Sequence, residues 1–370
     1  MKLIFFAFSF LLMTKGFSQK QFLLIGTYDS PKSEGIYVYE FEKLNGSVKE
    51  VSHVKTSNPS FMAISTNKKY VYAVNENAGK NGRGGSVTSF VFNKNVGKLT
   101  KINTQSSEGN DPCYIANDNS GKWIITGNYS SGNFAVLPVD KNGVLQKATQ
   151  TVQEQGKSVD AIRQNSPHVH TTFFSKNNKL LYVTDLGTDK IMVYNFDRKT
   201  GNVKPSTQKF ISIASGSGPR HIDISADNKF MYVVQELSGT IVLYSIKNNV
   251  LNELQTVSSL PIKFKGLAGS ADIHISPDGN FLYASNRGES NTIAIYKINK
   301  KTGYLSLLSH QSTLGLAPRN FNFDPSGKYL LVANQNSDEV VIFERDIKTG
   351  LLIDTGNRIS VGKPVCLKWL

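Results

Sequence analysis

Side chains that can bind anions or move protons lie at the two ends of a predicted β-hairpin in the middle of the chain. Arg220 and His221 open its first strand, and Gln235 and Glu236 close its second strand. In an antiparallel hairpin the first residue lies opposite the last, so the guanidinium of Arg220 and the carboxylate of Glu236 are predicted to meet at one end of the sheet. Such a pair can bind an anion and assist proton transfer.

This hairpin is one copy of a unit that recurs along the chain with constant spacing. The first and last residues of the six copies are Pro59 and Glu76, Pro112 and Tyr129, Val169 and Leu186, Pro219 and Glu236, Ser270 and Arg287, and Pro318 and Gln335. A turn and a third strand follow each hairpin, and a weaker outer strand follows most of them. Four strands per repeat are typical of the blades of a β-propeller.

The two ends of the chain each supply part of one more unit. Residues 22–28 and 35–41 have the pattern of a second and a third strand, and residues 364–370 have the pattern of an inner strand. Pairing the two ends would close the open edges of the ring. We therefore predict an all-β, seven-bladed β-propeller in one domain, residues 19–370, whose last blade is closed by N- and C-terminal strands.

Two positions of the repeat vary between blades and are predicted to face one rim of the propeller. The position after the first residue is occupied by Ser60, Cys113, His170, Arg220, Ala271, Arg319 and Val365, and the last position by Tyr28, Glu76, Tyr129, Leu186, Glu236, Arg287 and Gln335. Such variation is expected where each blade contributes a different group to one cavity. His168 lies two residues before His170 on the same strand face and could reach the same space.

Other polar positions of the repeat have simpler interpretations. The penultimate residue of the second strand is polar in every blade, which is best explained by capping of turns. His221 is predicted to point to the opposite face from Arg220, in a packing role, because side chains alternate along a strand. His53 and His310 fall in outer strands and are discounted.

The variable set favours hydrolysis or proton transfer on an anionic, carbonyl-bearing substrate. One group would activate water, and arginines would hold the anion and the developing oxyanion. A metal site at His168 and His170, with Glu236 or Asp185 as a further ligand, is disfavoured because Arg220 and Arg287 would crowd a cation. No Gly-x-Ser-x-Gly elbow indicates a serine nucleophile.

Two stretches depart from the repeat. Residues 77–85 are rich in glycine but lack the Gly-Lys-Ser/Thr ending of a phosphate-binding loop, so a flexible loop between strands is predicted. The polar insertion 153–167 carries Arg163, and it is either a lid or a tolerated insertion.

The charge of the chain limits the classes of partner that we expect. The chain has 42 Lys and Arg against 28 Asp and Glu, a formal charge of +14. The basic residues are scattered, so nucleic acid is not predicted, and a positive field would favour a small anion.

Lys2 and the apolar run 3–13 before Ser18 indicate a signal peptide, residues 1–18. We expect an exported, periplasmic or secreted protein with no membrane association in its mature form. Its two cysteines, Cys113 and Cys366, are expected to be buried and free.

The sequence resembles the propeller-type 6-phosphogluconolactonases, which are related to the fungal muconate lactonising enzymes. The resemblance spans nearly the whole mature chain, and the segments that carry it are 24–28, 35–39, 72–76, 128–132, 167–170, 182–187, 218–221 and 285–287. It implies hydrolysis of a sugar-derived lactone without a cofactor or metal. It also implies His170, Glu236, Arg220 and Arg287 as catalytic residues, which leaves His168, Glu76, Tyr129 and Arg319 as candidates for substrate binding.

Three questions stay open on the sequence alone. The chain could instead be a non-catalytic surface or binding propeller, or a muconate-type lactonising enzyme. Either His168 or His170 could be the functional histidine. The family's best-known substrate is a cytoplasmic phosphorylated lactone, whereas this chain is expected to be exported, so we expect an aldonolactone or another sugar-derived lactone, with the phosphorylated one as the family default.

Overall fold

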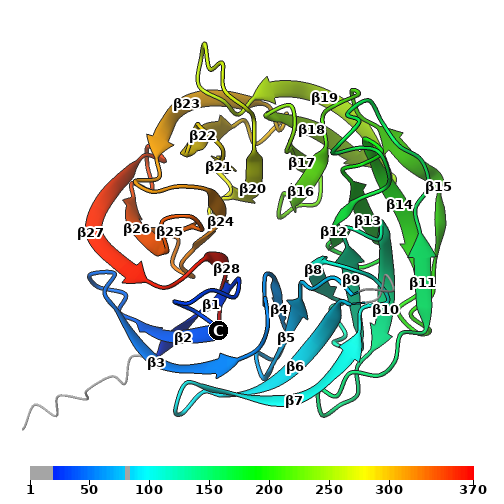
Figure 1. Ribbon diagram of the computed structural model, residues 1–370. Helices are drawn as coiled ribbons and strands as arrows, with labels where there is room; N and C mark the ends of the chain where they lie inside the picture. Colours follow the sequence, from blue (N-terminus) through cyan, green and yellow to red (C-terminus); the bar gives the residue numbers. More distant parts are fainter. Residues whose placement is uncertain (1–19, 80–83) are drawn as a thin grey trace, which may run out of the picture.

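Seven four-stranded antiparallel sheets are arranged around a central axis in the computed structural model, which describes residues 20–79 and 84–370 (Figure 1). All the regular elements of this part of the chain are strands. The seven blades of the predicted propeller are therefore confirmed. The predicted signal peptide and the middle of the glycine-rich stretch 77–85 lie outside the described residues.

The first and second strands of each blade lie nearest the axis. The inner strands are β4 (Met62–Ile64), β8 (Pro112–Asn117), β12 (Val169–Phe174), β16 (Pro219–Ile224), β20 (Ser270–Ile275), β24 (Pro318–Phe323) and β28 (Pro364–Trp369). Each pairs with a second strand, namely β5 (Tyr70–Asn75), β9 (Trp123–Asn128), β13 (Leu180–Asp185), β17 (Phe230–Gln235), β21 (Phe281–Asn286), β25 (Tyr329–Asn334) and β1 (Gln21–Thr27).

The third and fourth strands complete each blade outward. The third strands are β6 (Ser86–Asn93), β10 (Asn133–Pro138), β14 (Lys190–Phe196), β18 (Thr240–Lys247), β22 (Thr292–Ile298), β26 (Glu339–Arg345) and β2 (Gly35–Phe41). The outer strands are β7 (Lys98–Ser106), β11 (Gln150–Gln153), β15 (Val203–Ser212), β19 (Val250–Ser258), β23 (Leu305–Ser312), β27 (Leu352–Ser360) and β3 (Val48–Lys55).

The last blade combines one strand from the C-terminal end of the chain with three strands from the N-terminal end, as predicted. Its strand order is β28-β1-β2-β3, and β28 pairs with β1 from Leu23 opposite Trp369 to Thr27 opposite Pro364. The pairing covers the inner edge of β1 with β28, which is how the ring closes without a covalent link. Cys113 and Cys366 are both buried and free, as expected.

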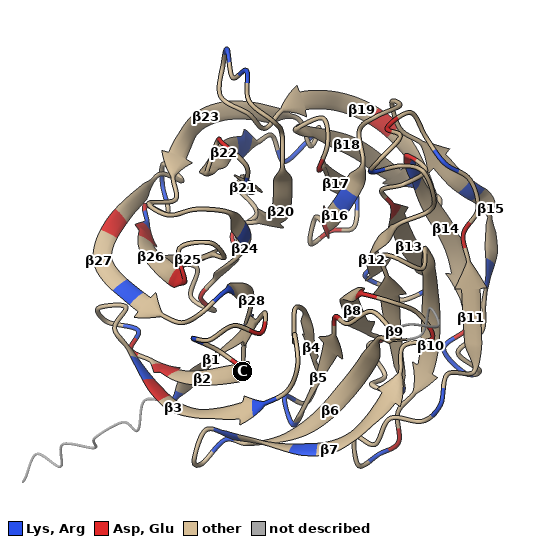
Figure 2. Ribbon diagram, viewed as in Figure 1, with Lys and Arg blue, Asp and Glu red and all other residues tan. Residues whose placement is uncertain are grey.

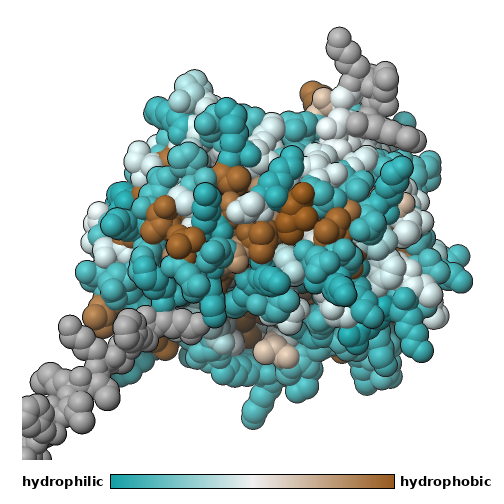
Figure 3. Space-filling view, turned by 90° about the horizontal axis from the view of Figure 1, so that it is seen from below, coloured by the Kyte–Doolittle hydropathy of each residue, from teal (hydrophilic) through white to brown (hydrophobic). Residues whose placement is uncertain are grey.

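Apolar side chains of neighbouring blades fill the space between the sheets. The second strands are buried along their whole length, whereas the residues of the outer strands are mostly exposed or partly buried. Seen from the side, the surface is mostly hydrophilic, with a band of apolar side chains across it (Figure 3). The basic and acidic residues lie mainly on the outer strands and loops, whereas β16 and β24 carry basic residues next to the axis (Figure 2).

Glycine turns set the contact between blades. The hydroxyl of buried Tyr232 donates to the carbonyl of Gly303 in the next blade at 2.7 Å, and Tyr283 donates to Gly350 at 2.6 Å. Gly303 has a φ of 77°, and a Cβ there would lie 2.5 Å from the ring of Phe230. Glycine alone fits both the left-handed backbone and the close packing.

Six inner strands carry a β-bulge at the rim. In β8, β12, β16, β20, β24 and β28 the pairing register shifts directly after the first residue, and the inner strand has one residue more than its partner there. An extra residue breaks the regular alternation of side chains and bends the strand. The bulges hold His170, Arg220 and Arg319, so they aim these three side chains toward the mouth of the ring.

Candidate active site

The predicted site residues gather at one mouth of the ring, around a cavity of about 510 Å³. Six of the eight candidates line this cavity: Tyr129, Glu76, His170, Glu236, Arg287 and Arg319. Arg220 lies behind the wall and bonds to Glu236. His168 also lies behind it, where its ring stacks on Tyr129 with the centroids 4.5 Å apart. His170 therefore lines the cavity, whereas His168 does not.

Glu236 is the centre of the cavity wall. Its Oε2 accepts from Nε of Arg220 at 2.9 Å and lies 2.9 Å from NH2 of Arg287. Its Oε1 accepts from NH2 of Arg163 at 2.6 Å. Burial alone would raise the pKa of Glu236, but Arg287, Arg220 and Arg163 together hold it far below its usual value. Glu236 is therefore an ionised carboxylate whose oxygens are already occupied by three guanidinium groups.

Arg163 is a site residue that the sequence did not single out as a candidate. It comes from the insertion after β11 and donates to the hydroxyl of Tyr129 at 3.1 Å as well as to Glu236. The available signal was one arginine in the longest departure from the repeat. The position of Arg163 in the sequence could not show that this segment contacts Glu236, which lies two blades further along the ring.

His170 lies beside the arginine cluster with its ring almost fully buried. Its Nε2 is 4.0 Å from Oε2 of Glu236, and its Nδ1 is buried without a hydrogen-bonding partner among the described residues. Burial first and then the neighbouring charge of Arg220 hold the pKa of His170 well below its usual value. The imidazole is therefore neutral at physiological pH and can accept a proton.

A second charged group lies across the cavity. Tyr28 donates its hydroxyl proton to Oε1 of Glu76 at 2.8 Å, and the guanidinium of Arg319 lies 5.3 Å from the centroid of the Tyr28 ring. NH2 of Arg319 is 3.9 Å from Oε2 of Glu76. Four arginines thus face two carboxylates at this mouth, which leaves an excess of two positive charges. An anionic ligand would be attracted to such a cavity.

The polar penultimate residues hold the segments around the mouth, and of the four named below only Asp185 caps the turn that follows it, as was predicted for the whole set. Asn75 donates to the carbonyl of Ser57, Asn128 to that of Ser107, and Asn334 to that of Thr313. Asp185 accepts from the backbone N–H groups of His168 and Gly187. These contacts are structural and leave the variable positions free to form the cavity.

The packing role expected for His221 is confirmed. Its ring packs edge-to-face against His170 with the centroids 5.2 Å apart, and it also contacts Phe61 and Tyr114 from other blades. The bulge in β16 adds a residue between Pro219 and Ile222, so the regular alternation of side chains used for that expectation does not hold at Arg220 and His221. His53 and His310 do lie on outer strands, β3 and β23.

Two further observations bear on what the chain could bind. No group of three or more histidine, cysteine or acidic residues positioned to hold a metal ion occurs within residues 20–79 and 84–370. In the same part of the chain, no helix is long and apolar enough to span a membrane.

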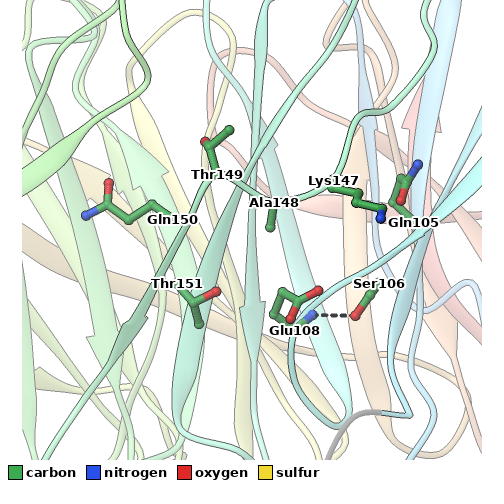
Figure 4. Close-up of a pocket in the computed structure, with 8 residues that line it drawn as sticks. All are labelled: Gln105, Ser106, Glu108, Lys147, Ala148, Thr149, Gln150 and Thr151. Atoms are coloured by element: carbon green, nitrogen blue, oxygen red, sulfur yellow. Dashed lines mark hydrogen bonds between the residues drawn. The ribbon is translucent and has the colours of Figure 1, made fainter.

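Another hollow, of about 410 Å³, lies between the outer strands β7 and β11 (Figure 4). It is lined by Gln105, Ser106, Glu108, Lys147, Ala148, Thr149, Gln150 and Thr151. It brings together neither a histidine nor a buried charge pair, so we place the candidate active site at the mouth of the ring.

Comparison with known proteins agrees with this fold. Residues 22–369 match a family described as lactonase, 7-bladed beta-propeller. The chain is 38% identical over 335 residues to a 6-phosphogluconolactonase of Formosa agariphila, covering 89% of this chain and 94% of that protein. It is 34% identical over 349 residues to a 6-phosphogluconolactonase of Bacillus subtilis, covering 94% and 97%. The solved structure of a periplasmic gluconolactonase of Pseudomonas aeruginosa matches with a TM-score of 0.90 and 35% identity, over 95% of this chain and 99% of that one.

Proposed function

The chain belongs to the family of seven-bladed β-propeller lactonases, and on this premise we propose that it hydrolyses a sugar-derived lactone to the open hydroxy acid. The substrate class is 6-phosphogluconolactone or a related aldonolactone. The relatives from Formosa agariphila and Bacillus subtilis support the phosphorylated compound, and the Pseudomonas aeruginosa relative supports the unphosphorylated one.

One observation supports the chemistry most directly. A neutral, buried imidazole and an arginine-rich anion site line the same cavity. A neutral imidazole can accept a proton from water, and guanidinium groups can stabilise the negative charge that develops on a carbonyl oxygen. Lactone hydrolysis needs both groups within reach of one carbonyl carbon.

We assign the role of general base to Nε2 of His170. A water molecule attacks the lactone carbonyl carbon as His170 takes its proton, and the carbonyl oxygen becomes an oxyanion. In this proposal Arg287, whose side chain lines the cavity, stabilises that charge. The ring C–O bond then breaks, and the leaving oxygen receives the proton from His170 to form the hydroxyl group.

Glu236 has a different role in this proposal, because an anion already bound by three arginines is a weak base. It fixes the directions of Arg220, Arg287 and Arg163 and keeps their charges close together. On the opposite wall, Arg319 and Glu76 are available to bind the hydroxyl or phosphate groups of the sugar.

The test is hydrolysis of glucono-, galactono- and 6-phosphogluconolactone by the purified protein, corrected for spontaneous opening. His170→Gln is expected to lower kcat by roughly 10²- to 10⁴-fold, the usual contribution of a general base. His53→Gln, an exposed histidine on an outer strand, is the matched control and should keep full activity. Absence of hydrolysis above background on all three lactones would reject the lactonase activity and favour a binding propeller.

We also propose that the mature chain is exported. The apolar segment before Ser18 supports this, as does the periplasmic relative from Pseudomonas aeruginosa. N-terminal sequencing of the protein isolated from its own cells should begin at Gln19. A protein that retains residues 1–18 and remains in the cytoplasmic fraction would contradict export.

A further inference from the structure

Behind the cavity lies a buried polar cluster that the proposed reaction does not use. It consists of His221 of β16, Asp272 and His274 of β20, and Asn320 of β24. Three of these side chains are almost fully buried, and that of His274 is 27% exposed. Because buried polar groups are costly unless they are paired, a cluster at the centre of the ring needs an explanation.

Asp272 is the acceptor that organises the cluster. Its Oδ1 accepts from Nδ1 of His221 at 2.7 Å. Its Oδ2 lies 3.0 Å from Nε2 of His274 and also accepts from the side-chain amide of Asn320. Burial would raise the pKa of Asp272, but His274 and the hydrogen bond from His221 hold it well below its usual value. Asp272 is therefore ionised and can only accept.

The ionised carboxylate fixes the tautomer of His221. Burial, and then the charge of Arg220, lower the pKa of His221 to about 3, so its ring is neutral. A neutral imidazole carries one proton, and the contact with Asp272 requires that proton on Nδ1. The lone pair of His221 is therefore on Nε2, which is buried and has no partner among the described residues.

The ring of His221 packs against the ring of His170. The two imidazoles meet edge-to-face at 70°, with the centroids 5.2 Å apart. His170 also has one buried nitrogen without a partner, Nδ1. A donor on His170 Nδ1 would satisfy the acceptor on His221 Nε2 through one bridging water, because neither nitrogen has a direct partner among the described residues.

Resting on the proposed function, we infer that Asp272 sets the tautomer of His170 through His221. The proton of His170 is held on Nδ1, toward His221, and its lone pair is on Nε2, toward Glu236 and the cavity. His221 and Asp272 are positioning residues, and the proton-accepting nitrogen of His170 is ready before the substrate binds.

The decisive measurement is the tautomer of His170 in the substrate-free protein, read from ¹⁵N chemical shifts of histidine-labelled samples. The His170 signals are assigned by their loss in His170→Gln. We expect a protonated Nδ1 and an unprotonated Nε2 in the wild type. A proton on Nε2, or an even mixture of the two tautomers, would overturn the inference.

Asp272→Asn tests the direction of control. The amide of asparagine can donate to Nδ1 of His221, which moves the His221 proton to Nε2 and turns an acceptor into a donor. The proton of His170 should then shift to its Nε2, and kcat on the best lactone should fall by about 10²-fold or more with KM little changed. An unchanged His170 tautomer in this folded variant would contradict the inference.

His221→Phe is the second variant, since it keeps an aromatic ring against Phe61 and Tyr114 while removing the acceptor. It should abolish the single tautomer of His170, and retention of that tautomer would contradict the inference. His310→Gln, in an outer strand, is the control. Failure of the lactonase proposal is a separate result, because the tautomer is measured without substrate.

Discussion

The carboxylate of Glu236 shows how one residue depends on its surroundings. Three guanidinium groups lie within hydrogen-bonding distance of its two oxygens, and only 7% of its side chain is exposed. Removing one partner of a buried ionic cluster costs more than the cluster contributes, because the charges left behind are uncompensated. A change at Glu236 is therefore expected to affect both the stability and the activity of the protein.

We predict that Glu236→Gln destabilises the protein by about 3–5 kcal/mol, the usual cost of breaking a buried pair. Urea unfolding of the wild type and the variant measures this difference. Glu76→Gln is the matched control, because its amide oxygen can still accept from Tyr28, and its cost should stay within about 1 kcal/mol. Equal stability of the Glu236→Gln variant and the wild type would show that the arginines do not need the carboxylate.

Arg163 is predicted to affect binding more than folding. Its side chain is 41% exposed, and its ion pair with Glu236 is at the edge of the cavity. Arg163→Gln should raise KM for a phosphorylated lactone by about tenfold, or about 1.4 kcal/mol, with a smaller effect on a neutral lactone. Lys157→Gln, in the same segment, removes the same charge and should leave both values unchanged. A fall in kcat with unchanged KM would instead place Arg163 in the chemical step.

At the scale of elements, the insertion that carries Arg163 is held at its first residues by a buried carboxyl group. Glu154 accepts from the hydroxyl of Tyr194 on β14 at 2.5 Å, and its N–H donates to the carbonyl of Gly132. Ser158, further along, donates to Asp189, which also accepts from the backbone N–H of Gly218 next to β16. The insertion is thus tied to the loop that leads to Arg220.

The anchor at Glu154 is predicted to weaken as the pH rises. Burial raises the pKa of Glu154 to about 7 from an ordinary value of 4.5. The folded protein therefore binds the proton more tightly than the unfolded chain, so this contribution to stability is full below pH 4.5 and is lost as the pH rises through 7. The loss is at most about 3 kcal/mol.

Urea unfolding at pH 5 and at pH 8 measures that loss. The wild type should lose more stability between the two pH values than Glu154→Gln, whose amide does not titrate in this range. A difference between wild type and variant that does not change with pH would contradict the raised pKa of Glu154.

For the whole molecule, the pairing of β28 with β1 determines whether the ring is closed. β28 contributes the buried residues Val365, Cys366 and Leu367 and covers the inner edge of β1. Deleting residues 364–370 is expected to abolish cooperative thermal unfolding and to produce aggregates, because it exposes strand edges and apolar surface. Deleting Leu370 alone is the control. A monomeric, cooperatively unfolding protein without residues 364–370 would show that the closure is dispensable.

Much of the architecture could be predicted from the sequence because the propeller repeats. The constant spacing from Pro59 to Glu76 and from Pro318 to Gln335 reflects a hairpin whose length is fixed by its turn and by the ring. The same regularity makes unusual residues visible, so Glu236 and Arg287 stood out against their counterparts in other blades. Both line the cavity in the structure.

What the sequence by itself determined is therefore the number of blades, their closure by the two chain ends, and the rim on which the variable residues meet. Only the tertiary structure decided that Arg163 reaches Glu236 and that His221 packs against His170. A repeat specifies local pairing, whereas a bulge adds one residue and breaks the regular alternation of side chains. Contacts across the axis join blades that are distant in the sequence, and no local pattern encodes them.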